Sequence, residues 1–96
     1  MELTIFARFH AREGNENAVR DAIREVIALT RTEPGCLSIG AHRSTRDPRL
    51  FYIHSRWIGE AAFDEHAELA HTVRFIERVE PLIDHPLDVA RTLPVG

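Results

Sequence analysis

His66 is the side chain of this sequence that is best suited to acid–base chemistry. Histidine changes its charge closer to neutral pH than other residues, so it can serve as a general base or a proton donor. His66 falls on an apolar stripe, one helical turn from Phe63 and from Leu69. A histidine in such a place is either a catalytic group or a hydrogen-bonded core residue, and the sequence leaves both interpretations open.

Ser55 and Trp57 alternate along an expected strand, so both side chains point to the same face of a sheet. That face should lie beneath the helix that carries His66, and all three side chains could then line one cavity. Trp57 would give the cavity a flat wall and an indole N–H donor, or it would only fill the core. Ser55 would hydrogen-bond a ligand, or it would only bond to the backbone.

His71 follows His66 by five residues, which is not the i, i+4 spacing of a helical metal site. In a continuous helix His71 would point about 140° away from His66, because each residue turns by about 100°. If the helix breaks near residues 67–70, His71 could instead turn back over the cavity. Both arrangements remain open.

Residue types that the chain lacks narrow the chemistry further. All 12 basic residues are arginines, and the absence of lysine excludes a Schiff base, a P-loop and a lysine-bound pyridoxal cofactor. The single cysteine, Cys36, excludes an internal disulfide and a cysteine cage for a metal, and we expect it to be a small buried hydrophobe. Three histidines fall on expected strands without carboxylates at matching spacing, so we expect no metal site there: His10, His42 and His54.

Length and charge indicate one small domain over residues 1–96. The formal charge of −3 and the isoelectric point near 6.0 give no electrostatic reason to expect binding to nucleic acid or to an anionic membrane surface. No apolar run approaches the roughly 18 residues of a membrane span, and the first residues do not resemble a signal peptide. We therefore expect a cytoplasmic protein.

Hydrophobic periodicity predicts six elements in the order βαββαβ. Apolar residues alternate in three early stretches and repeat at helical spacing in two others. The expected strands cover residues 2–10, 36–46, 50–58 and 87–93, and the expected helices begin near Asn15 and Gly59. Asn15 is a plausible N-cap, Glu33-Pro34-Gly35 ends the first helix, and Asp47-Pro48 turns the hairpin. The apolar positions expected to be buried on the first helix are Val19, Ala22, Ile23, Val26, Ile27 and Leu29, and those on the second are Phe63, His66, Leu69, Val73, Ile76 and Val79.

This order predicts an α+β, ferredoxin-like fold, in which helices pack on one face of a four-stranded antiparallel sheet. The third expected strand places Phe51, Ile53, Ser55 and Trp57 on the helix side. Its other face carries Tyr52 and Ile58, and the first strand adds Phe6 to the same face. That face is too apolar for bulk water, so we expect a second copy of the chain to cover it in a homodimer.

Four short runs, taken in order, resemble the antibiotic biosynthesis monooxygenase domain, a dimeric α/β-barrel family. The runs are residues 4–9, residues 33–38, Arg56-Trp57, and residues 61–66 with His71 following. The similarity extends from Leu3 to about Leu93. It implies a homodimer and a small-molecule substrate, and in part of the family an oxygenase that uses O₂ without metal or flavin. Other members degrade haem, but the residues of that branch have no counterparts here.

Two positions depart from the family pattern. Ser55 stands where the family often has a glutamate, and Ala70 stands where a proline commonly precedes the second histidine. The first departure removes a buried carboxylate that could orient a base. The second leaves open where the helix breaks.

The resemblance and the candidate residues together suggest a cofactor-independent oxygenase of an electron-rich phenol, quinol or related enolisable compound. His66 would accept the proton with help from His71, and Ser55 or the Trp57 N–H would hold the oxyanion. Trp57, Phe63 and Phe75 would form the wall of the site. The alternatives are an isomerase that only transfers protons and a non-enzymatic dimeric binding or accessory module.

Overall fold

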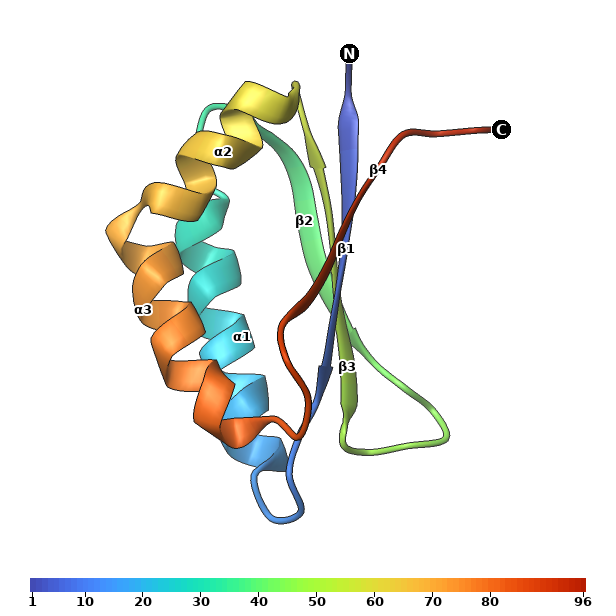
Figure 1. Cartoon of the computed structure of the whole chain (residues 1–96), viewed down its shortest axis with the longest axis vertical. Coiled ribbons are helices and arrows are strands. Elements are labelled where there is room, and N and C mark those ends of the chain that lie inside the picture. Colours follow the sequence, from blue (N-terminus) through green and yellow to red (C-terminus); the bar gives the residue numbers. More distant parts are fainter.

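The computed structural model describes residues 1–96 and has the predicted βαββαβ order. Three α-helices lie together on one face of a twisted four-stranded sheet, and no helix covers the other face (Figure 1). The elements are β1 (Leu3–His10), α1 (Glu16–Thr30), β2 (Cys36–Arg43), β3 (Leu50–Trp57), α2 (Glu60–Glu68), α3 (Ala70–Val79), a 3₁₀ turn η1 (Glu80–Leu82) and β4 (Asp88–Thr92). The α+β ferredoxin-like fold is therefore confirmed.

The sheet has the strand order β2-β3-β1-β4, and every neighbouring pair is antiparallel. The two central strands pair Ile5 with Ser55 and Leu3 with Trp57. Because side chains alternate along a strand, these pairs all point to the helix side. All four residues are buried, which confirms the predicted inner face.

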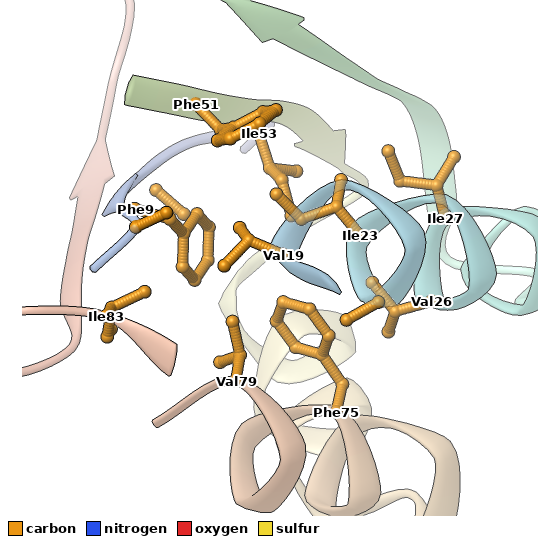
Figure 2. Packing of buried hydrophobic residues seen from close by; sticks show 13 residues of the cluster. Phe9, Val19, Ile23, Val26, Ile27, Phe51, Ile53, Phe75, Val79 and Ile83 are labelled. Carbon is orange, nitrogen blue, oxygen red and sulfur yellow. The ribbon is translucent and has the colours of Figure 1, made fainter. Parts of the chain in front are cut away.

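The main core lies between the centre of the sheet and helices α1 and α3 (Figure 2). Val19 and Val79 have no exposed surface, and Phe9 meets Phe75 edge-on with ring centroids 5.6 Å apart. Burying one such side chain contributes about 1.5–3 kcal/mol. This layer fixes α3, and therefore Phe75, against the sheet.

Helix α1 begins and ends close to the predicted residues, but two details differ. Asn15 occupies the N-cap position without a capping hydrogen bond from its side chain. Instead the Glu16 carboxylate accepts a 2.9 Å bond from the backbone N–H of Gly14, whose φ of 88° favours glycine. Leu29, expected in the core, is 38% exposed, and Thr30 takes the buried position because its hydroxyl bonds to the carbonyl of Val26.

The second helical region breaks at Leu69, whose φ of −67° and ψ of 146° are extended. The break resets the helical phase, so the single apolar stripe predicted through residues 63–79 is wrong at Leu69 and Val73, whereas Val79 is buried as predicted. Leu69 and Val73 are 39% and 41% exposed, and the buried residues of α3 are Thr72, Phe75 and Val79. A break inside residues 67–70, left open by the sequence, is thus what the chain adopts.

The outer face of the sheet is uncovered within one chain. Phe6 is 49% exposed and Tyr52 is 39% exposed, and Phe6 lies 5.1 Å from the ring of His54. The C-terminal residues run away from the helical layer (Figure 1). None of the helices has the length and the apolar character that crossing a bilayer would require.

Candidate active site

Glu33, His66 and His71 meet beside the break between α2 and α3. The Oε2 atom of Glu33 lies 2.8 Å from Nδ1 of His66 and 2.8 Å from Nε2 of His71. The three side chains are only 10%, 12% and 16% exposed, respectively. A carboxylate shielded to this extent needs hydrogen-bond partners, and here both partners are imidazoles.

The hydrogen bonds fix the tautomers of the two histidines. An ionised carboxylate only accepts, so Nδ1 of His66 and Nε2 of His71 each carry the proton that is donated to Glu33. The Thr72 hydroxyl lies 3.3 Å from the same Nδ1. With Nδ1 protonated, the neutral His66 ring has its free lone pair on Nε2, which is the arrangement that a general base requires.

The helix break is what brings the two histidines to one carboxylate. His66 lies in the last turn of α2, and His71 is the second residue of α3. Glu33 lies in the turn after α1, where its backbone N–H bonds to the carbonyl of Thr30. The sequence marked Glu33 only as part of a helix stop and of a family-like run, so its role beside His66 was missed. No spacing rule connects residues on three different elements.

Trp57 and Ser55 form a second buried pair under α2. The Trp57 indole Nε1–H donates to Ser55 Oγ at 2.9 Å, and the two residues are 1% and 3% exposed. The Trp57 ring also lies 4.7 Å from the His66 ring and 5.5 Å from the Phe63 ring. The indole N–H is thus engaged inside the protein, and of the two oxyanion donors considered above, Ser55 is the one with a free hydroxyl proton.

A cavity of about 190 Å³ lies between the sheet and the helices beside these groups. Four of the predicted site residues line it: Ser55, Phe63, His66 and Phe75. Trp57 does not line the cavity but packs behind Ser55 and His66. His71 faces a different place, an open groove between α1 and α3 that also contains Arg74 and Arg78.

The rest of the cavity wall is almost entirely apolar. The remaining lining residues are Ile5, Ala7, Phe9, Val26, Thr30, Ile39, Ile53, Ala67, Thr72, Ile76, Leu87 and Val89. None of these side chains is charged. The cavity is therefore a place for a small uncharged molecule next to one base.

The same three donor atoms of Glu33, His66 and His71 lie within 4.8 Å of one another, close enough for one metal ion to touch all of them. It is the only such group in the chain. Hydrogen bonds already satisfy the carboxylate oxygen without an ion. The strand histidines behave differently, since His10 bonds to Asp47 and Asp84 while His54 packs on Phe6.

Cys36 does not have the surroundings of a nucleophile. Burial, reinforced by the nearby Glu33 carboxylate, raises the pKa of the Cys36 thiol. A raised pKa leaves little thiolate near neutral pH, and the thiolate is the reactive form. Cys36 packs instead against the cluster formed by Leu3, Ile5 and Trp57.

Residues 3–78 match the family model described as antibiotic biosynthesis monooxygenase. The chain belongs to this family. Among curated relatives of this monooxygenase-family chain, "Putative monooxygenase Rv0793" of Mycobacterium tuberculosis is 28% identical over 93 residues, covering 97% of this chain and 91% of that protein. "Putative monooxygenase YcnE" of Bacillus subtilis is 29% identical over 69 residues, covering 72% and 73%.

Solved structures agree with this membership. The structure of Rv0793 superposes with a TM-score of 0.94 at 26% identity, covering all of this chain (100%) and 97% of that one. The structure of PA3566 from Pseudomonas aeruginosa gives a TM-score of 0.91 at 28% identity, covering 99% and 95%. In this antibiotic biosynthesis monooxygenase family member, position 55 is a serine, and the carboxylate partner of His66 is Glu33.

Proposed function

We propose that this protein is a cofactor-independent monooxygenase that acts on a small electron-rich aromatic or quinol-type compound with O₂. The observation that carries the proposal is the placement of His66. Its Nδ1 is held by Glu33, and the residue also lines a largely apolar cavity. A base oriented on one side and facing an apolar cavity on the other is what deprotonation of a weakly acidic substrate needs.

In the proposed reaction His66 accepts a proton from the bound substrate through Nε2. The positive charge that forms on the ring is stabilised by the Glu33 carboxylate, which stays ionised, as the aspartate does in a catalytic triad. The Ser55 hydroxyl donates to the oxygen that becomes negative. The deprotonated, electron-rich substrate then reduces O₂ itself, so that one oxygen atom enters the product and the other leaves as water.

The homodimer is part of the same proposal. A second copy would cover the outer face of the sheet, where Phe6 and Tyr52 are exposed. Sedimentation should give twice the chain mass, and Phe6→Arg should shift the equilibrium toward the monomer by placing a charge in the interface. A monomer at micromolar concentration in the unsubstituted protein would rule the dimer out.

Oxygen uptake with purified protein tests the reaction. The preparation should be free of metal and flavin, and the substrates should be quinols, phenols and anthrones, with and without air. We expect protein-dependent O₂ consumption that falls at least about 10²-fold in His66→Ala, the usual scale for loss of a general base. The control is His42→Ala, because His42 lies on the exposed edge strand β2.

The same arrangement of a base, a hydroxyl donor and an apolar cavity would also serve an isomerase, which only moves protons. Substrate turnover that depends on His66 but not on air would favour that function. Binding without turnover, in a stable dimer, would favour the non-enzymatic binding module. Either result would refute the oxygenase proposal.

A further inference from the structure

We infer that the cavity selects an uncharged ligand with a single six-membered ring and a free hydroxyl group, which is held between His66 and Ser55. This inference rests on the proposed function in that it uses the same cavity. It goes further, because it excludes the fused-ring and acidic members of the broad class of electron-rich aromatics.

Volume is the first argument. The cavity measures about 190 Å³. An apolar cavity of about 150 Å³ in another protein holds benzene, whereas sites for drug-sized ligands measure about 300–1,000 Å³. The space beyond one ring is therefore enough for a few substituent atoms and not for two further fused rings.

The walls cannot easily widen, because they belong to packed secondary structure. Ile5 and Ile53 lie on the two central strands and are 3% and 7% exposed. Opposite them, Phe75 is locked against Phe9 in an edge-on contact. The β4 side is open, where Leu87 and Val89 are 37% and 46% exposed, so we place the entrance there.

Hydrogen bonding is the second argument. Ser55 Oγ accepts the Trp57 indole N–H, which leaves the hydroxyl proton of Ser55 to be donated elsewhere. Thr30 is not available, because its hydroxyl donates to the carbonyl of Val26 at 2.7 Å. The cavity thus offers Ser55 as a donor and Nε2 of His66 as an acceptor, while the Thr72 hydroxyl lies beside Nδ1 of the same ring. One ligand hydroxyl satisfies both, since it donates to the imidazole and accepts from the serine.

Charge is the third argument. No arginine lines the cavity, and the Glu33 carboxylate behind His66 is already bonded to that residue. A carboxylate or phosphate on the ligand would lose its hydration without gaining a counter-ion, which is strongly unfavourable. Aromatic acids should therefore be excluded even when their ring fits.

Four ligands of matched size test these arguments by calorimetry or ligand-observed NMR under nitrogen. We expect 4-methylphenol and hydroquinone to bind at least about tenfold more tightly than methoxybenzene, which lacks the hydroxyl proton, and than 4-hydroxybenzoate, which adds a charge. Anthrone represents the fused-ring class and should also bind at least about tenfold more weakly. Equal binding of anthrone or of 4-hydroxybenzoate, or no binding by any single-ring phenol, would overturn the inference.

A cavity variant makes the volume argument sharper. Phe75→Leu enlarges the cavity from the α3 side and should raise the affinity for 1-naphthol relative to 4-methylphenol by about tenfold. Leu29→Ala is the control, because Leu29 lies outside the cavity and also loses apolar volume. No change in the ratio with Phe75→Leu would contradict the assignment of this wall.

The binding and oxygen-uptake experiments test the ligand class and the oxygenase function independently. Tight binding of single-ring phenols without any O₂ uptake would remove the oxygenase function and leave the ligand class standing. Oxygen uptake with anthrone and none with single-ring phenols would keep the oxygenase function and refute the single-ring ligand class.

Discussion

The carboxylate of Glu33 lies 2.8 Å from Nδ1 of His66, although the two residues are 33 positions apart in the chain. Glu33 follows α1 and His66 lies in the last turn of α2, so the contact joins the turn after α1 to α2. The same oxygen atom also receives His71 from α3. This one carboxylate therefore both orients the candidate base and ties together the three helices of the fold.

Replacing Glu33 by glutamine should weaken this junction. The amide keeps the shape but loses the charge, and charge-assisted hydrogen bonds are about twice as strong as neutral ones. We expect a loss of about 1–3 kcal/mol in the free energy of unfolding, measured in urea. The ¹⁵N chemical shifts of His66 should also change, because a neutral amide no longer fixes its tautomer. Glu65→Gln, on the exposed side of α2, should change neither quantity, and unaltered His66 shifts in Glu33→Gln would contradict the assigned contact.

Trp57 and Ser55 should be energetically coupled. Trp57→Phe retains most of the ring that packs on Phe63 and His66 but removes the 2.9 Å bond to Ser55. When Trp57 is present, Ser55→Ala leaves the buried indole N–H without a partner. When Trp57 is already phenylalanine, Ser55→Ala leaves no donor unpaired. A double-mutant cycle should therefore give a coupling free energy of about 1 kcal/mol. Strictly additive losses would show that the bond contributes nothing.

Gly35 should tolerate no side chain. A Cβ atom at this position would lie 2.6 Å from the Cβ of Ala62, so the turn before β2 and helix α2 would have to separate. We expect Gly35→Ala to cost about 1–3 kcal/mol of stability, the usual range for overpacking. Because Ala62 and His66 share α2, ligand binding should weaken as well. Gly40→Ala is the matched control, since its Cβ would come no closer than 4.0 Å to His42.

Acid should destabilise the protein partly through His10. The Asp84 pKa is held below its ordinary value chiefly by the hydrogen bond from His10. The Asp47 pKa is also lowered, first by the backbone N–H of Arg49 and then by His10. His10 can donate to both carboxylates only as an imidazolium, because a neutral ring has a single donor.

Because both carboxylates have lowered pKa values in the folded state, the protein should lose stability as the pH falls. Each carboxylate contributes stability that is complete above its ordinary pKa, about 3.9, and is lost as the pH falls through the lower folded-state value. The free energy of unfolding should therefore fall below about pH 4. Besides the two carboxylates, His85 and Arg49 face this group, and Nε2 of His85 accepts the backbone N–H of His10. Asp84→Asn should flatten the fall, whereas Asp88→Asn, which removes a carboxylate without an ion pair, should not.

The sequence by itself determined the order of the elements and the inner faces of the strands. Alternation in β1 and β3 depends only on whether each residue meets the helices or the outside, so Ile5, Ile53 and Trp57 could be placed without knowing their partners. The same patterns predicted that Ser55, Trp57 and His66 line one cavity, and the lining includes Ser55 and His66 but not Trp57. Helical periodicity failed at Leu69 and Val73, because one extended residue resets the helical phase there. Val73 is exposed, and Thr72 is buried instead.

Tertiary structure alone decided which polar groups meet. His66 bonds to Glu33, 33 residues away in the chain, and His10 bonds to Asp84, 74 residues away. No period or motif relates such positions, because their distance depends on how whole elements pack rather than on local geometry. The direction of the Trp57 N–H was equally hidden, since a rotamer is chosen by its packed neighbours. Periodicity therefore places a residue on a face of the fold, and only packing gives it a partner and a chemical role.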